Sequence, residues 1–238
     1  MSVAIRGNVA VRGNVGLNRY NILQYAALWL SDTGSDPATW SDISGNNNHV
    51  TQADAAKQPA IIAGGLNGRQ IRRFDGGDFL QHSLSSFLDS PSQITVFAVA
   101  YGSVGSIGAL VSKSGSTSAA NGWRFYLNSS PDGQVLFRSN WGVLLGASGS
   151  NSDWRVMVGS YVSGEQRVVI NGSVVGSGTS TTPAATNTNK LSIGVMTSGA
   201  NGLVGDIAEI IVFPTALSTS DRQSVERYLS AKWNIPLT

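Results

Sequence analysis

Short segments rich in β-branched and aromatic residues recur along the chain, and clusters of Gly, Asn, Ser and Pro separate them. Segments of this kind are typical of β-strands, and the clusters between them are typical of turns. The pattern therefore restricts the chain to an all-β fold built from many short strands. The strands that it predicts are 26–30, 69–74, 79–81, 94–101, 109–113, 123–128, 135–139, 155–162, 166–170, 190–194 and 204–213.

Asn-Gly pairs mark several of the turns between these strands. Both residues tolerate the positive φ that tight hairpin turns require. The strongest of the pairs, Asn171-Gly172, lies between two valine-rich segments. We therefore expect a β-hairpin around it.

The last part of the chain has the pattern of a helix instead. Ser218 and Asp221 have the spacing of a capping box at the start of a helix. Apolar residues then recur at helical spacing, and they are Val225, Tyr228, Leu229 and Trp233. We expect this helix to end before Pro236 and its apolar stripe to pack on the β domain.

Length and composition narrow the class further. With 238 residues, the chain suits one large all-β domain and needs no disulfides for stability. It contains no cysteine, which excludes a disulfide framework, thiolate metal sites and a cysteine nucleophile. Charged residues make up only 13% of the chain and the net charge is +2, so we expect no nucleic-acid partner.

The N-terminus carries arginines where a signal peptide would need an apolar run. No stretch reaches the ~20 apolar residues of a membrane helix, and the most apolar run, 207–213, has the length of a strand. We expect no membrane insertion and no export by the general secretory route.

A tandem six-residue repeat, AIRGNV at 4–9 and AVRGNV at 10–15, sets the first 25 residues apart. Its even period would place Arg6 and Arg12 on one face of an extended chain.

Val9 and Val15 share that spacing, Arg19 adds a third positive charge, and no acidic residue precedes Asp32. Two interpretations stay open. The segment is either a frayed basic arm or an arm that docks on another subunit by strand addition and charge.

Several motifs follow one another in the order found in a known family. They are WSDISGN (40–46), QP (58–59), NGR (67–69), RFDGGDFL (73–80), VING (169–172), LSIG (191–194) and GDIAEIIVFPTALS (205–218). In these motifs the chain resembles laminin-G-like, concanavalin A-like jelly rolls. The resemblance implies a sandwich of two antiparallel sheets with one C-terminal helix, which we expect residues 26–238 to form. Residues 1–25 lie outside the resemblance, and we expect them to form an extended N-terminal arm.

The sequence offers little to support catalysis. Glycoside hydrolases use two carboxylates that act on one bond. Asp206 and Glu209 are the nearest candidates, but their odd spacing on a strand would point them to opposite faces. His49 and His82 are the only histidines, and we expect both to be loop or strand-end residues, exposed or capping. We therefore expect no enzyme, no catalytic residues and no cofactor.

Calcium is the one metal that the resemblance suggests, because some relatives bind it through acidic residues in their loops. Acidic residues gather in the N-terminal loops, and they are Asp32, Asp36, Asp42, Asp75 and Asp78. Asp42 and Asp75 belong to motifs that serve as structural turns in this fold, so we expect them to cap their own backbone.

For sugar binding, the best candidate is Trp141, in the polar segment Ser-Asn-Trp-Gly. Trp29, Trp40, Trp123 and Trp233 lie at positions that indicate the core.

These observations favour a non-enzymatic structural protein, mounted by its arm on other virion proteins as a phage capsid decoration, knob or tail-fibre module. We expect it to form a homo-oligomer and to reach the virion by assembly in the host cytoplasm. The alternative is a carbohydrate-binding, lectin-like module. Both interpretations hold if the domain mounted on the virion contacts host surface glycans. A glycan hydrolase is the third interpretation.

Overall fold

The computed structural model describes residues 21–89, 91–102, 108–114, 122–128, 135–139, 142–145, 153–162, 164–180, 186–196 and 201–238. Strands dominate this part of the chain, and one α-helix, α1 (Thr219–Trp233), follows the last of them. Two short 3₁₀ helices, η1 (Asn21–Tyr25) and η2 (Ala55–Lys57), lie in the N-terminal third.

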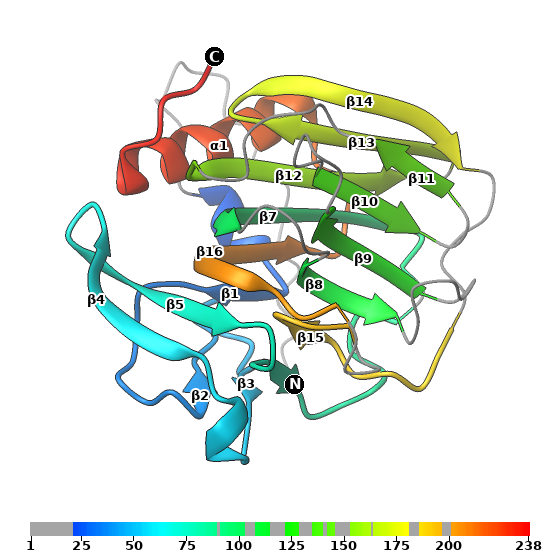
Figure 1. Ribbon diagram of the computed structural model, residues 1–238. Helices are drawn as coiled ribbons and strands as arrows, with labels where there is room; N and C mark the ends of the chain where they lie inside the picture. The colour runs from blue at the N-terminus through cyan, green and yellow to red at the C-terminus, as the bar shows by residue number, and fades with distance from the viewer. Residues whose placement is uncertain are drawn as a thin grey trace, which may run out of the picture.

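The described strands form two antiparallel sheets (Figure 1). In spatial order, the first sheet consists of β14 (Ser173–Ser180), β13 (Gly164–Ile170), β12 (Arg155–Val162), β7 (Gln93–Gly102), β16 (Val204–Phe213), β5 (Arg69–Asp75) and β4 (Ala60–Leu66), with β1 (Leu28–Leu30) also paired to β16. The second sheet consists of β11 (Gly142–Leu145), β10 (Val135–Ser139), β9 (Gly122–Leu127), β8 (Gly108–Ser114), β15 (Ser192–Ile193), β6 (Leu80–His82), β3 (Val50–Thr51) and β2 (Thr39–Trp40). This arrangement confirms the two-sheet sandwich with a C-terminal helix.

Most of the predicted strands are present, and β12 and β16 have the predicted bounds. The sequence missed β2, β3, β4 and β11. The first two have only two residues each. β4 contains Gly64 and Gly65 and has a register irregularity against β5, so it lacks the alternation of a regular strand.

The predicted hairpin at Asn171-Gly172 connects β13 to β14. Both turn residues have positive φ, 48° at Asn171 and 90° at Gly172. The side chain of Asn171 also accepts a hydrogen bond from the Val156 N–H at 2.9 Å, which ties the turn to β12. A local turn signal was therefore sufficient to place this hairpin.

Helix α1 begins as the capping box predicted. Oγ of Ser218 accepts a hydrogen bond from the Asp221 N–H at 3.2 Å. At the other end, Asn234 adopts the left-handed conformation and its N–H donates to the Ser230 carbonyl. The helix therefore ends at Trp233, ahead of Pro236.

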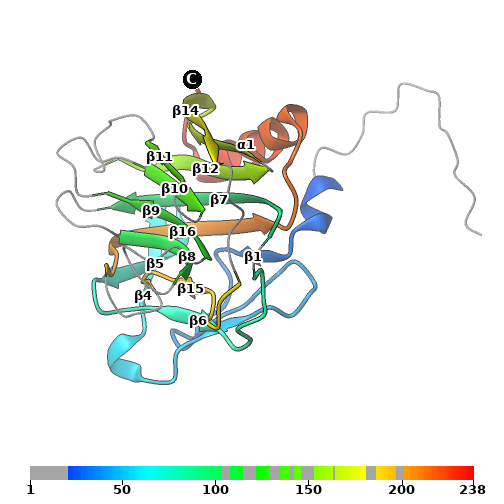
Figure 2. The ribbon, with the colours of Figure 1, turned by 90° about the vertical axis from the view of Figure 1, so that its right-hand side faces the viewer.

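Two apolar clusters hold the layers together. One fills the space between the sheets and includes Phe74, Trp40 and Trp123. The other lies on the outer face of the first sheet, which is the face turned away from the second sheet. There α1 contributes Leu229 and Trp233, and the helix lies beside β12 in both views (Figure 1, Figure 2).

Three of the four tryptophans expected in the core are buried there. The fourth, Trp29, is only half-buried, because it packs at the edge of the outer cluster against Tyr228.

The end of the expected arm needs a correction. Residues 21–25 form η1, and Leu23 is buried in the outer cluster with α1. These five positions are thus part of the folded domain and not of an extended arm. The predicted docking residues lie outside the described residues, and they are Arg6, Val9, Arg12, Val15 and Arg19.

Within the described residues, the structure contains no helix that is both long and apolar enough to cross a membrane.

Candidate functional site

The sequence-based candidate for sugar binding, Trp141, lies outside the described residues. Sugar binding by Trp141 therefore stays a prediction. The structure shows a different candidate binding site, which the sequence did not predict.

The two acids of β16 do not point to opposite faces, as their spacing predicted. The pairing of β16 with β7 has a register irregularity between Ile207 and Glu209, where Ala208 is the extra residue. Such a β-bulge shifts the alternation of side chains by one position. Ile207 and Ile210 both belong to the cluster between the sheets, so Asp206 and Glu209 both point to the outer face.

Glu209 lies under α1 and is 1% exposed. Its carboxylate accepts hydrogen bonds from Nε1 of Trp29 and Nε1 of Trp233, each at 2.6 Å, and from the Tyr228 hydroxyl at 3.2 Å. Nζ of Lys232 forms an ion pair with it at 2.9 Å. We call this group of five residues the Glu209 cluster. The carboxylate is fully occupied by protein partners, and the cluster is a structural tie that connects α1 to the first sheet.

The cluster continues to the surface through Asp32. Asp32 pairs with Lys232 and Arg69, each at 2.8 Å. Burial alone would raise the pKa of Asp32, but hydrogen bonds from Lys232 and Arg69 outweigh it and hold the pKa well below its usual range. Burial and the neighbouring Glu209 carboxylate raise the pKa of the Tyr228 hydroxyl.

The acids considered for calcium have other roles. Asp42 accepts hydrogen bonds from the N–H groups of Trp29, Ser44 and Asn48 at 2.8–3.0 Å, and Asp75 accepts one from Gly77 at 2.8 Å. These contacts confirm that both are turn residues. Within the described part of the chain, no three His, Asp or Glu side chains come together as a metal site.

The two histidines also have local roles. His49 is exposed, and its Nδ1 accepts a hydrogen bond from the Asp42 N–H at 2.9 Å. His82 is buried, stacks on Phe87 with ring centroids 4.2 Å apart, and caps the Leu84 N–H at 3.1 Å. His82 thus caps as expected but is not exposed.

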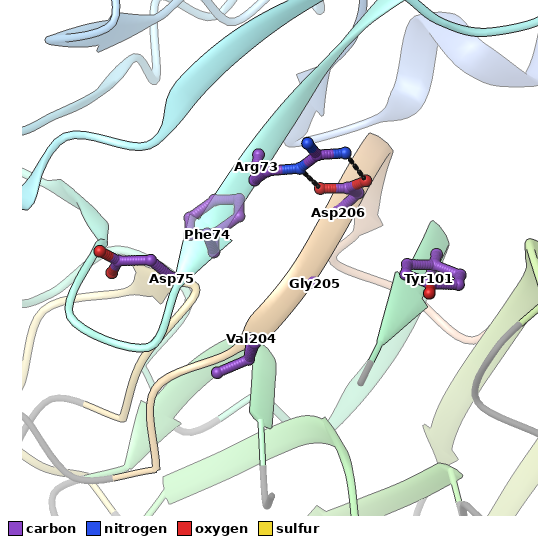
Figure 3. Close-up of a pocket in the computed structure, with 7 residues that line it drawn as sticks. All are labelled: Arg73, Phe74, Asp75, Tyr101, Val204, Gly205 and Asp206. Carbon is purple, nitrogen blue, oxygen red and sulfur yellow. Dashed lines mark hydrogen bonds and ion pairs between the residues drawn. The ribbon is translucent and has the colours of Figure 1, made fainter. Parts of the chain in front are cut away.

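A pocket of about 470 Å³ opens where β5, β16 and β7 lie side by side (Figure 3). It lies on the outer face of the first sheet, beside Asp206. The lining residues are Arg73, Phe74, Asp75, Tyr101, Val204, Gly205 and Asp206. Three segments far apart in the sequence thus form one site.

An ion pair between Arg73 and Asp206 forms one wall of this pocket, as Figure 3 shows. Nε and Nη2 of Arg73 donate to the two oxygens of Asp206 at 2.8 and 2.9 Å. This two-pronged contact raises the pKa of the guanidinium. The Arg73 side chain stays 55% exposed, whereas Asp206 is 7% exposed, so the pair presents mainly arginine to the solvent.

An aromatic wall stands across β16 from that pair. Tyr101 points to the outer face, because Phe97 and Val99 of the same strand belong to the outer cluster. The rings of Tyr101 and Trp154 lie 6.0 Å apart at an angle of 35°. Exposed Val204 adds an apolar contact.

The backbones of β16 and β7 come very close together at Gly205, beside the pocket. A Cβ atom at Gly205 would lie 2.3 Å from the Tyr101 carbonyl oxygen. Only glycine therefore allows β16 to approach β7 so closely at this point.

A smaller hollow of about 250 Å³ lies between β12, β13 and the segment leading to α1. Glu165 and Arg167 form an exposed ion pair there, but no aromatic side chain is among the described residues that line the hollow. The larger pocket is therefore the better candidate site. It combines an apolar surface with donors and acceptors in fixed positions, which suits a ligand with an apolar face and polar edges.

Two stacked antiparallel sheets closed by a C-terminal helix define a lectin-like jelly roll. The chain belongs to the concanavalin A-like lectin/glucanases superfamily, whose model matches residues 75–221, more than half of its length. No curated protein matches the sequence.

Solved structures share the fold at low sequence identity. The binding domain of botulinum neurotoxin serotype D matches with a TM-score of 0.64 and 14% identity, over 92% of this chain and 56% of that one. A GH54 α-L-arabinofuranosidase matches at 0.60 and 16%, over 82% and 51%. A Trypanosoma rangeli sialidase matches at 0.62 and 11%, over 87% and 33%.

This chain therefore spans about half or less of each of those proteins. Binding domains and glycosidases both occur among them, so the likeness shows the fold and not the activity.

Proposed function

We propose that the protein is a non-enzymatic, lectin-like module and that the pocket at Arg73, Tyr101 and Asp206 binds a glycan. The observation that carries the proposal is the position of an aromatic ring opposite a two-pronged ion pair in an open pocket. A sugar ring has an apolar face that packs on an aromatic side chain and hydroxyl groups that hydrogen-bond at its edges. The arabinofuranosidase and the sialidase that share this fold act on sugars, as their names state, which agrees with the proposal.

The same pocket argues against hydrolysis. A glycosidase needs one carboxyl group to donate a proton and a second carboxylate to act as nucleophile or base. Both oxygens of Asp206 are engaged by Arg73, and among the described residues that line the pocket Asp75 is the one other carboxylate. We therefore propose binding without turnover.

A glycan array tests this proposal with three variants. Tyr101→Ala removes the aromatic wall, and we expect it to abolish binding that the wild type shows. Tyr25→Ala is the matched control, because Tyr25 is 64% exposed on η1 and lies outside the pocket. Trp141→Ala tests the sequence-based candidate. Loss of binding in Trp141→Ala but not in Tyr101→Ala would move the site away from this pocket, and an array without any wild-type binding would refute the function.

The docking arm and the phage setting are a second proposal, supported by the sequence of residues 1–20. Arginine at positions 6, 12 and 19, with no acid before Asp32, gives the segment a charge that suits an acidic virion partner. In this proposal the protein is assembled into virions in the host cytoplasm, as a homo-oligomer.

Deletion of residues 1–20 tests the arm separately from the pocket. We expect the truncated domain to unfold cooperatively, because η1 and Leu23 remain in place, and to lose its attachment to phage particles. Particles that retain the truncated protein at normal occupancy would contradict the docking role. Glycan binding by the truncated domain should be unchanged.

A further inference from the structure

We infer that the pocket selects neutral glycans and discriminates against glycans that carry carboxylate groups. This inference rests on the proposed function, since it concerns the ligand of the same site. It follows from the charges of the described residues around the pocket and from the ion pair that Arg73 already makes with Asp206.

Arg73 is the only cation among the residues described as lining the pocket. A guanidinium binds a carboxylate best through two parallel hydrogen bonds. Arg73 already makes that contact, because its Nε and Nη2 face the two oxygens of Asp206. An incoming carboxylate would therefore meet a guanidinium whose charge is balanced.

Acidic side chains outnumber Arg73 around the same pocket. Asp75 and Asp206 both line it, and with Arg73 they give the described lining residues a formal charge of −1. Asp78 stands directly behind Asp75, since its carboxylate accepts the Asp75 N–H at 3.1 Å. A carboxylate on the ligand would thus approach a negative surface, which costs binding energy.

A neutral sugar fits the same groups well. Nη1 of Arg73 makes no hydrogen bond within the described part of the chain, so it can donate to a hydroxyl group. The Asp75 carboxylate is exposed and can accept from one. Tyr101 and Val204 provide the apolar surface for the C–H face of the ring. Hydroxyl groups use these donors and acceptors without bringing a charge.

Matched oligosaccharides test this inference. The probes are tetrasaccharides of β-1,4-linked glucose, galactose and mannose, each paired with the form in which the C6 hydroxymethyl groups are oxidised to carboxylates. Isothermal titration calorimetry at low salt and neutral pH measures both members of each pair. For each neutral glycan that binds, we expect its carboxylate form to bind at least about tenfold more weakly, a difference of about 1.4 kcal/mol. Added salt should narrow the gap.

Variants assign the effect to the pocket. Asp75→Asn keeps an oxygen for the Gly77 N–H and removes one negative charge, so the preference for the neutral form should shrink. Glu165→Gln removes an exposed carboxylate from β13, outside the pocket, and should leave the preference unchanged.

The outcomes separate the two claims. If a carboxylate form binds as tightly as its neutral partner or more tightly, the inference is overturned, while glycan binding itself stands. If Glu165→Gln reduces the preference as much as Asp75→Asn does, the discrimination belongs to the overall charge of the protein and the inference fails. If no member of any pair binds, the proposed function fails.

Discussion

The outer face of the first sheet has two ends that use the same strand in different ways. At one end, which we call the closed end, α1 covers Glu209, and two indoles, one phenol and one ammonium group surround its carboxylate. At the other, open end, Asp206 forms an ion pair with the exposed Arg73 at the wall of a pocket. The two acids are three positions apart on β16 and point to the same face.

Both acids are buried and hydrogen-bonded, so the difference lies in their partners: those of Glu209 lie under or within α1, whereas Arg73, the partner of Asp206, stays largely exposed. A buried carboxylate needs hydrogen-bond partners, and at the closed end α1 supplies three of them and Trp29 of β1 the fourth. At the open end one arginine satisfies Asp206 and still presents an exposed side chain. We therefore expect substitutions at the closed end to affect stability and substitutions at the open end to affect binding.

Trp233→Ala should have the largest effect. It removes a fully buried indole and one hydrogen bond to Glu209, so we expect a loss of about 5 kcal/mol in the free energy of unfolding. Urea unfolding measures it. Trp233→Phe keeps most of the ring and removes only the N–H, so its loss should be about 1–3 kcal/mol. A loss below about 1 kcal/mol for the alanine variant would mean that α1 packs through another face.

Glu209→Gln should rank second, with a loss of about 3 kcal/mol. The variant removes the negative charge that faces Lys232 and places an amide where indole N–H groups donate. Glu165→Gln is the control, because its exposed ion pair with Arg167 should contribute well under 1 kcal/mol. Equal losses in the two variants would remove the distinction between the closed end and an ordinary surface.

Asp32→Asn should show a smaller loss that depends on pH. The pKa of Asp32 is lower in the folded state than in the unfolded chain, so its stabilisation is present above the unfolded value of about 4 and is lost as pH falls. We expect a loss of about 1–2 kcal/mol near neutral pH that shrinks steadily below about pH 4. A loss that stays constant with pH would contradict the role of the charged pair with Lys232.

Arg73→Ala should have the smallest effect on stability, about 1 kcal/mol or less, because Arg73 is largely exposed and lies at an open pocket, so that its removal lets water reach the Asp206 carboxylate. Its effect on glycan binding should be large. Arg73→Lys keeps the charge but cannot make the two-pronged contact, so it should also bind weakly. A destabilisation as large as that of Glu209→Gln would instead make the Arg73–Asp206 pair a structural tie like the one at the closed end.

Local signals account for what the sequence could predict. The capping box at Ser218, the Asn171-Gly172 turn and the β-branched run of β16 each specify their own element through neighbouring residues. The motifs placed these elements in a jelly roll by resemblance.

The site depended on pairing between strands that are distant in sequence. The bulge at Ala208 exists only in the pairing of β16 with β7, and the spacing of the two acids alone predicted the wrong faces. Arg73 meets Asp206 because β5 pairs with β16 in one particular register. No feature of either segment reveals that register, so the pocket could not be predicted from spacing.

The most direct test of the account is to locate bound glycan on the protein by NMR. In a titration with a neutral tetrasaccharide that binds, we expect the largest amide shift changes at 73–75, 101 and 204–206, and little change around Glu209 and α1. Shift changes that instead gather on the second sheet, or at the hollow beside Glu165, would contradict the assignment of the open end as the binding site.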